Sequence, residues 1–315
     1  MSVEPASPPH LDLTRLRVLA AVARTGSVTA AARDLHYAQP SVSHHLARLE
    51  AEAGIPLLQR AGRGVRLTEA GRLLAERAEE ILGRVEGARR ELDALVGLRA
   101  GRARLAAFPS ALATLVPAAV ASLRADHPGL SVGLVEAEPP EAAAVLQAGD
   151  VDVALVFRHT DVPHAKAMDL SRFEATVVHE EPIALVRRAS DVARTGVTGD
   201  DGGPPPLDDL RDASWIAGCE RCRADLVSRC AVAGFAPRIA FETDDYVAVQ
   251  ALVASGAGVS LLPSLALRAH RHPGVVAQHL PGATRQVLAL TVGAPTPAAR
   301  ALVERLVEAG AAARD

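Results

Sequence analysis

The strongest constraint on this chain is a run of three short helical patterns at residues 13–53, separated by only a few residues each. In the first, the apolar positions recur every three or four residues, on one helical face: Leu13, Leu16, Ala20 and Ala23. Gly26 can end this helix, and Ser27 can cap the second, SVTAAARDL. A tight turn at Tyr37 and Ala38 follows. Helices this short and closely connected must bury their apolar faces against one another.

The third helical pattern, QPSVSHHLARLEAEAG, has two chemically different faces. Pro40 suits the first turn because its missing N–H would have no partner there. The apolar stripe consists of Val42, Leu46, Leu49 and Ala53. The opposite face carries Ser41, His44 and Arg48, with His45 beside them. Hydrogen-bonding groups and a permanent cation suit base edges in a DNA major groove, although an ordinary solvated helix face has the same composition.

A glycine- and arginine-rich stretch, IPLLQRAGRGVRLTEAG, follows Gly54. Gly62 and Gly64 allow a turn, and the cations on either side have no acid among them: Arg60, Arg63 and Arg66. This stretch predicts a short basic hairpin whose arginines bind phosphate while the third helix reads the bases. Residues 1–67 are therefore expected to form a winged helix-turn-helix.

Residues 11–71, LDLTRLRVLAAVARTGSVTAAARDLHYAQPSVSHHLARLEAEAGIPLLQRAGRGVRLTEAG, resemble the DNA-binding region of LysR-type transcriptional regulators. The resemblance implies a scaffold helix containing Ala31, Ala32 and Leu35. It implies a recognition helix that starts with Gln39, Pro40, Ser41, Ser43 and His44. It also implies that the wing contacts DNA through Arg60, Arg63 and Arg66. His44 and His45 stand where many members have Arg or Gln, so the base preference stays open.

The charge is unevenly distributed along the chain. Residues 1–67 contain eight Arg and five Asp or Glu, whereas the remainder contains 26 basic and 32 acidic residues. A basic module on a more acidic body indicates a polyanionic partner for the module alone. The N-terminal sequence has no export-signal pattern, and no stretch approaches the roughly 18 apolar residues of a spanning helix. We therefore expect a cytoplasmic protein without a membrane partner.

Residues 68–100 predict a linker helix that starts at Thr68. Its apolar positions alternate steps of four and three: Leu74, Ala78, Ile81, Val85, Ala88, Leu92 and Leu95. Such a seam favours a coiled coil between two chains, although packing against the protein's own body is the alternative. Paired linker helices would fix two recognition helices at one spacing, which selects an interrupted inverted repeat in double-stranded DNA. The LysR-type resemblance implies a homodimer that pairs again into a homotetramer.

Residues 101–315 predict two α/β lobes. Apolar strand patterns alternate with helical ones, which indicates parallel sheet covered by helices. Crossover strands near Val177–Val186 and Val275–Leu280 would connect lobe I (about 101–179 and 277–315) with lobe II (about 180–276), and a separate last strand RQVLALTV would return to lobe I. The segment SDVARTGVTGDDGGPPPLDDL is expected to be a surface loop. The body resembles the LysR-type effector domain, whose architecture is that of type 2 periplasmic binding proteins.

The cleft between such lobes is the expected site for a small-molecule effector of unknown identity, because ligands bind at strand ends and helix starts in α/β sheets. The candidate contacts lie at those ends: Ser110, Arg158, His159, Cys219, Glu220 and Thr243. Helix capping explains Ser110 and Thr243 equally well.

No motif supports an enzyme, since G-x-S-x-G, G-x-x-x-x-G-K-[ST] and HExxH patterns are all absent from the sequence. No cofactor and no metal are expected. A solute-binding protein without a regulatory role would share the two-lobed body, but it would not need the first hundred residues. The best hypothesis is a sequence-specific transcriptional regulator controlled by a small molecule.

The three cysteines of the chain lie together in GCERCRADLVSRC. A closed zinc site needs four ligands, and no histidine is adjacent, so zinc is disfavoured. A redox-sensing regulator that uses Cys219, Cys222 and Cys230 is the alternative, because Cys222 lies near a helix start that can lower the pKa of a thiol. One effector class of the resembling family is an oxidant. The favoured interpretation buries Cys230 in the core of lobe II and places Cys219 in the cleft wall.

Overall fold

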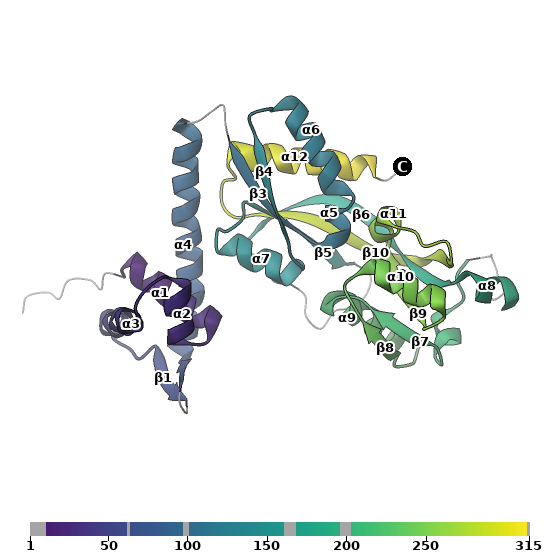
Figure 1. The fold of residues 1–315 in the computed structure, drawn as a ribbon, viewed down its shortest axis with the longest axis horizontal. Coiled ribbons are helices and arrows are strands. Elements are labelled where there is room, and N and C mark those ends of the chain that lie inside the picture. The colour runs from purple at the N-terminus through teal and green to yellow at the C-terminus, as the bar shows by residue number, and fades with distance from the viewer. Residues whose placement is uncertain (1–10, 62–63, 97–100, 161–167, 196–202, 314–315) are drawn as a thin grey trace, which may run out of the picture. The chain divides into compact units, whose positions relative to one another are not determined.

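The computed structural model describes residues 11–61, 64–96, 101–160, 168–195 and 203–313 (Figure 1). The chain forms two compact units, of which the first runs to Leu95 and the second starts at Val96. The described helices were searched for membrane spans, and none is both long and apolar enough to cross a bilayer. Each unit is described by itself below.

The N-terminal unit is a three-helix core with a hairpin and one long helix. Its elements are α1 (Leu13–Thr25), α2 (Val28–Asp34), α3 (Gln39–Ala53), β1 (Leu58–Ala61), β2 (Gly64–Leu67) and α4 (Glu69–Val96). One apolar cluster joins the first three helices to Leu57 and the start of α4. The predicted winged helix-turn-helix is therefore confirmed as a fold, with β1 and β2 paired antiparallel.

The ends of these helices follow the local sequence. Asp12 accepts hydrogen bonds from the first turn of α1, and Gly26 ends that helix with φ +65°. Ser27 caps α2 by accepting from the Ala30 N–H, as predicted. The turn before α3 places His36 at φ +55°. Leu13 differs from its prediction, because it lies at the open end of α1 and is 42% exposed.

Contacts between α3, the hairpin and α4 fix the position of the wing. The Glu50 carboxylate accepts hydrogen bonds from the backbone N–H groups of Leu57 and Leu58, at 2.8 and 2.9 Å. Thr68 caps α4 by accepting from the Gly71 N–H. A Cβ atom on Gly71 would lie 2.0 Å from the Leu57 carbonyl oxygen. Only glycine lets α4 approach the chain this closely.

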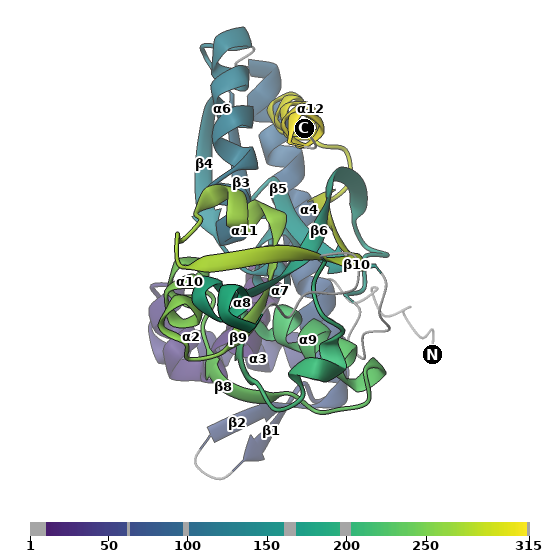
Figure 2. The same ribbon diagram turned by 90° about the vertical axis from the view of Figure 1, so that its right-hand side faces the viewer.

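The C-terminal unit is built on one eight-stranded sheet, in the order β4-β3-β5-β10-β6-β9-β7-β8. The short strands are β3 (Arg102–Ala107), β4 (Ser131–Glu136), β5 (Val153–His159), β7 (Ser214–Ala217), β8 (Arg238–Glu242) and β9 (Val259–Pro263). Within each lobe the neighbours pair in parallel, as predicted: β3 with β4 and β5, and β7 with β8 and β9. Figure 2 shows the long central strands that connect the lobes.

Those central strands are β6 (Glu174–Arg188) and β10 (Val275–Thr291), which pair antiparallel along most of their lengths. The sheet is therefore mixed: strands cross between the lobes near Val177–Val186 and Val275–Leu280 as predicted, but the prediction of a separate last strand was wrong. Residues 275–280 and 285–291 belong to one strand with an irregularity between His279 and Thr284. Most backbone N–H and C=O groups of β10 pair with β6, and those of Arg285–Leu290 lie between β6 and β5.

Helices cover both lobes. They are α5 (Pro109–Leu112), α6 (Leu115–Asp126), α7 (Pro139–Gln147), α8 (Ala189–Thr195), α9 (Glu220–Val232), α10 (Tyr246–Ser255), α11 (Ser264–Ala269) and α12 (Pro297–Ala312), with a 3₁₀ turn at Leu207–Leu210. In lobe I, α6 and α12 lie on one face of the sheet and α7 on the other (Figure 1). The predicted surface loop at residues 190–210 was wrong for α8 and for the 3₁₀ turn, and residues 196–202 lie outside the described residues.

Candidate functional site

The exposed face of α3 carries the residues predicted to bind DNA. Gln39, Pro40, Ser41, Ser43, His44 and Arg48 are exposed, and His45 is half-buried. The Gln39 amide donates a hydrogen bond to the Ser43 hydroxyl at 3.1 Å. The rings of Tyr37 and His45 stack at 5.9 Å. Tyr37 is 43% exposed beside this face, and its place in the turn gave no signal in the sequence.

The hairpin of β1 and β2 carries the basic residues predicted to contact phosphate. Arg66 on β2 is exposed. Arg60 lies on β1, but its side chain is outside the described part of the chain, as is the whole of Arg63. The wing that carries them is held against α3 by Glu50. One module thus presents a polar helix face and a cation-bearing hairpin.

The seam predicted along α4 divides into two parts. Ala78 is fully buried and Leu74 packs beside it, both against the core of their own N-terminal unit. Ala78 is therefore not available to a second chain, which corrects the prediction for this position. Ile81 and Val85 are 37% and 41% exposed, and Ala88 is also exposed. Leu92 and Leu95 lie on α4, but their side chains are outside the described residues.

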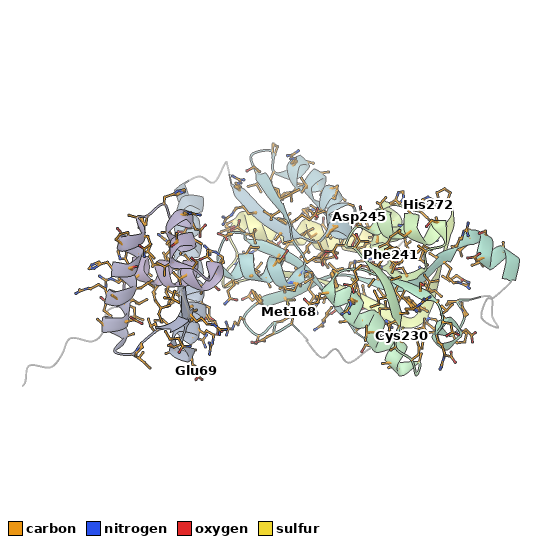
Figure 3. The ribbon with its side chains drawn as sticks, turned by 60° about the horizontal axis from the view of Figure 1, so that its bottom comes forward. Glu69, Met168, Cys230, Phe241, Asp245 and His272 are labelled. Carbon is orange, nitrogen blue, oxygen red and sulfur yellow. The ribbon has the colours of Figure 1, made fainter. Side chains whose placement is uncertain are left out.

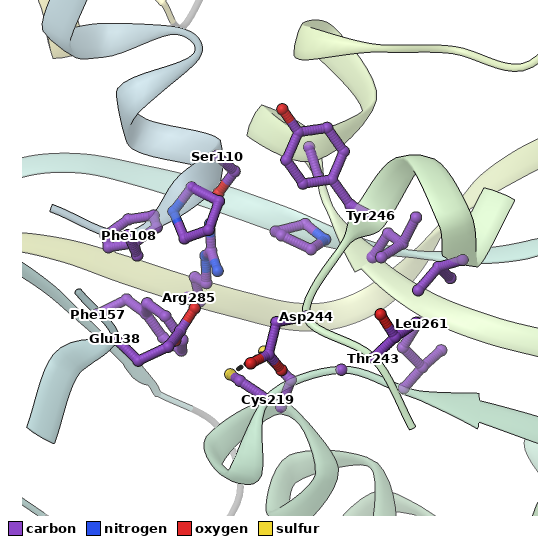
Figure 4. A pocket seen from close by; sticks show the side chains of 17 residues that line it. Phe108, Ser110, Glu138, Phe157, Cys219, Thr243, Asp244, Tyr246, Leu261 and Arg285 are labelled. Carbon is purple, nitrogen blue, oxygen red and sulfur yellow. Dashed lines mark hydrogen bonds between the residues drawn. The ribbon is translucent and has the colours of Figure 1, made fainter. Parts of the chain in front are cut away.

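A pocket of about 50 Å³ lies between the two lobes of the C-terminal unit, with room for a few water molecules (Figure 4). It opens where the carboxyl ends of the parallel strands face each other, the usual place for ligands in α/β sheets. Its lining residues are Phe108, Pro109, Ser110, Glu138, Phe157, Gly218, Cys219, Cys222, Thr243, Asp244, Tyr246, Val249, Leu261, Leu262, Pro263, Ala266 and Arg285. Ser110, Cys219 and Thr243 are thus brought together as the sequence predicts.

Arg285 forms the charged floor of the pocket and is only 2% exposed. Its Nε donates to Glu181 at 2.7 Å, and its Nη2 donates to the Ser110 hydroxyl at 3.0 Å. The guanidinium also lies over the rings of Phe108 and Phe157, at 4.9 and 4.4 Å from their centroids. Ser110 is therefore a partner of Arg285 and does not cap α5, whose N-cap is Phe108.

Two carboxylates also line the pocket, Glu138 before α7 and Asp244 before α10 (Figure 4). Burial raises the pKa of Glu138, and the neighbouring charge of Asp244 adds to this effect, whereas the Cys219 thiol and the charge of Arg285 oppose it without reversing it. One carboxylate oxygen of Glu138, Oε2, is buried and accepts no hydrogen bond among the described residues. Thr243 does not cap α10, because Asp245 is the N-cap.

The three cysteines occupy two different environments. Cys219 is the N-cap residue of α9 and lines the pocket with Cys222, and the Cys219 thiol donates to the Cys222 sulfur at 3.2 Å. This hydrogen bond, together with burial, raises the pKa of Cys219. Cys230, labelled in Figure 3, is fully buried in the core of lobe II beside Trp215. Burial raises the pKa of Cys230 to about 12.

Three predicted effector contacts do not line the pocket. Arg158 is exposed, because alternate side chains of β5 point to opposite faces, and it donates two hydrogen bonds to Gln286. His159 is buried beyond Phe157 with its Nδ1 3.4 Å from Asp225 Oδ1. Glu220 is exposed on the first turn of α9. These corrections leave Ser110, Cys219 and Thr243 from the predicted set.

The prediction missed most of the chemistry of the pocket. Glu138 and Asp244 both follow strand ends, so their positions in the sequence could have suggested them. Arg285 gave no such signal, because it lies within a strand and reaches the pocket only through the pairing of β10 with β6. In the described part of the chain, no group of three or more His, Cys, Asp or Glu side chains could hold a metal ion.

Two family models match the chain. The model of the bacterial regulatory helix-turn-helix protein, lysR family, matches residues 13–72, and that of the LysR substrate binding domain matches residues 97–311. The uncharacterized HTH-type transcriptional regulator YcgK of Bacillus subtilis (strain 168) is 30% identical over 285 residues, 84% of each chain. The probable HTH-type transcriptional regulator LrrA of Synechococcus elongatus is 28% identical over 283 residues, 90% of each chain.

Solved structures share the fold. The crystal structure of CbnR, a LysR family transcriptional regulator, has a TM-score of 0.59 at 23% identity, covering 95% of this chain and 99% of that one. Full-length CbnR in complex with its target DNA has a TM-score of 0.58 at 24% identity, covering 95% and 100%. The two domains in this order, and relatives that are transcriptional regulators and not enzymes, confirm the resemblance seen in the sequence. The chain belongs to the LysR family of DNA-binding transcriptional regulators with an effector-binding domain.

Proposed function

We propose that this regulator reads an interrupted inverted repeat in the cytoplasm, through α3 and the wing of two paired chains. The polar face of α3 supports base contacts by Gln39, Ser43, His44 and Arg48. The exposed Arg66, with Arg60 and Arg63, supports phosphate contacts. The apolar residues Ile81 and Val85 stay exposed in one chain, which favours pairing of α4 with a second α4 as a homodimer, and further pairing into a homotetramer.

The effector is proposed to bind in the pocket between the lobes and to change how the two wings engage DNA. The observation that carries this proposal is that both lobes contribute polar residues to one pocket. Ser110 and Glu138 come from lobe I, Arg285 comes from the central strand β10, and Cys219 and Asp244 come from lobe II. A ligand that touches both lobes stabilises one relative position of them over others. A change in that position is transmissible to the paired DNA-binding modules.

The roles in DNA binding are tested on a fragment from upstream of the protein's own gene, with footprinting and gel-shift titrations at several salt concentrations. Arg48→Ala should lower affinity for the specific site by about 1–3 kcal/mol and relax sequence preference. Arg66→Ala should weaken binding about equally on all sequences and reduce the salt slope by about one. Arg77→Ala, an exposed arginine of α4 paired with Glu80, is the matched control. Absence of any protected site, or equal losses on specific and random DNA for Arg48→Ala, would contradict these roles.

A second candidate function is sensing of a hydroperoxide by Cys219 and Cys222. A CxxC pair at the start of a 13-residue helix, with sulfurs 3.2 Å apart, is favourable for dithiol chemistry. Cys222, the more exposed thiol, would attack the peroxide oxygen and form a sulfenic acid with release of water or an alcohol. Cys219 would then displace the sulfenic oxygen as water, which forms the disulfide. Two thiols lose two electrons and two protons, and the peroxide is reduced.

Mass spectrometry of peroxide-treated protein tests this candidate. The expected product is a disulfide between Cys219 and Cys222 that is absent from Cys222→Ser, whereas Cys230→Ser, a change in the buried core, should still form it. DNA protection should change in parallel and recover with dithiothreitol. Thiols that stay reduced, or a disulfide that leaves DNA protection unchanged, would eliminate peroxide sensing.

A further inference from the structure

We propose that the effector of this pocket is a small organic cation, a protonated amine with a short apolar part, held between Glu138 and Asp244. This inference rests on the proposed function of the pocket and adds the class of its ligand. It follows from which charges in the pocket already have partners and which do not.

The one cation of the pocket lining is already compensated. Arg285 is 2% exposed and pairs with Glu181 at 2.7 Å, and both side chains are buried. The guanidinium also lies over two aromatic rings and donates a hydrogen bond to the Ser110 hydroxyl. A carboxylate ligand would have to compete with Glu181 for a charge it can barely reach. Arg285 therefore does not act as an open receptor for an anion.

The carboxylates of the lining are less completely compensated, since Glu138 has only the Cys219 thiol and the already paired Arg285 as favourable neighbours. Glu138 and Asp244 form no ion pair among the described residues, and both point into the pocket (Figure 4). They repel each other, since the charge of Asp244 raises the pKa of Glu138. The buried Glu138 Oε2 also accepts no hydrogen bond within the described chain, which is costly for a carboxylate. An ammonium group supplies both the missing charge and the missing N–H donors.

The positions of the two carboxylates give such a ligand a mechanical effect. Glu138 belongs to lobe I and Asp244 to lobe II, so a cation between them is attracted to both lobes. Without a bound cation, the repulsion between Glu138 and Asp244 opposes closure of the two lobes. With a cation between them, both carboxylates are attracted to it, and closure is favoured. Most of the remaining wall surface is apolar and includes Phe108, Val249 and Leu261. A pocket of about 50 Å³ accepts a short apolar chain, and a metal ion would find too few ligands.

The test compares probes of the same shape and opposite charge. Calorimetry and thermal unfolding of the full chain, followed by Trp215 fluorescence, are measured with propylamine and butylamine and with propionate and butyrate. The amines should bind and raise the unfolding temperature, and the carboxylates should not. Glu138→Gln should weaken amine binding at least about tenfold, since it removes a partly buried charge partner. Glu304→Gln, an exposed change on α12 outside the pocket lining, is the matched control and should bind normally.

Binding of the carboxylates in place of the amines would overturn the cation assignment and leave the effector pocket in place. Failure of all four probes, or amine binding that Glu138→Gln leaves unchanged, would also overturn it. The pocket itself is tested separately with Leu261→Trp, which fills the space from β9. The footprint of Leu261→Trp on DNA is compared with that of the wild type, with and without each probe. If the two footprints and their responses to every probe are the same, the proposed function of the pocket fails independently of ligand charge.

Discussion

Arg285 and Glu181 are direct partners across the antiparallel strands β10 and β6, and their side chains form an ion pair of 2.7 Å in which neither is more than 3% exposed. Glu181 also accepts a hydrogen bond from the Leu265 N–H at the start of α11. The pair therefore fixes the place where the two long strands, α11 and the pocket floor meet.

Replacing Arg285 by Met should destabilise the C-terminal unit by about 3–5 kcal/mol, because it leaves Glu181 buried without its counter-charge. The double variant Arg285→Met with Glu181→Met should recover most of the loss. Trp215 is the only tryptophan and is fully buried in this unit, so its fluorescence during urea unfolding reports the change. A single variant with the unfolding midpoint of the wild type would show that the pair does not contribute.

Gly71→Ala should displace the wing, because the new Cβ would lie 2.0 Å from the Leu57 carbonyl oxygen. We expect DNA affinity to fall at least about tenfold in gel-shift titrations, since wing contacts to phosphate depend on this position. Gly54→Ala is the control: it has φ +67° and no atom within 4 Å of the added Cβ. It should cost about 1–2 kcal/mol of stability through backbone strain and retain the DNA affinity. Equal affinities for both variants would contradict the prediction.

Glu138 should make the stability of the C-terminal unit depend on pH. Burial raises its pKa above the ordinary value of 4.5, so between the two values the folded state binds more protons than the unfolded state. The free energy of unfolding should therefore fall as the pH rises through the raised pKa. Glu138→Gln should remove this slope and be more stable than the wild type at pH values above the raised pKa, whereas the exposed change Glu304→Gln on α12 should keep the slope. Trp215-monitored unfolding at a series of pH values checks both, and an unchanged slope in Glu138→Gln would refute the assignment.

Ile81→Glu combined with Val85→Glu should weaken association of the chains, because it places charges on the exposed apolar part of α4. Sedimentation equilibrium should show smaller species at micromolar concentration. Leu73→Glu is the control on the same helix, since Leu73 is 57% exposed and lies off the seam. Association that is lost in Leu73→Glu and retained in the double variant would place the contact elsewhere on α4.

The helix-turn-helix was predictable because its determinants are local. Gly26, Ser27 and Gly54 mark helix ends through backbone conformation and capping, and the apolar spacing selects the buried faces. The seam of α4 was only partly predictable. A period of 3.5 shows that a face is apolar, but it does not tell whether that face meets the same chain, as at Ala78, or a second one.

The sequence alone determined the family, the order of the two domains and the local elements that carry Ser110, Cys219 and Thr243 to the pocket. Only the tertiary structure decided what that pocket is chemically. Arg285 and Glu181 are 104 residues apart in the chain, and strand pairing places them side by side. The positive charge of Arg285, which could otherwise bind an anion, is therefore neutralised by Glu181. Glu138 and Asp244 are brought to one space from different lobes. The charge of a site depends on the distances between such residues in space, and these distances cannot be read from the number of residues that separate them in the sequence.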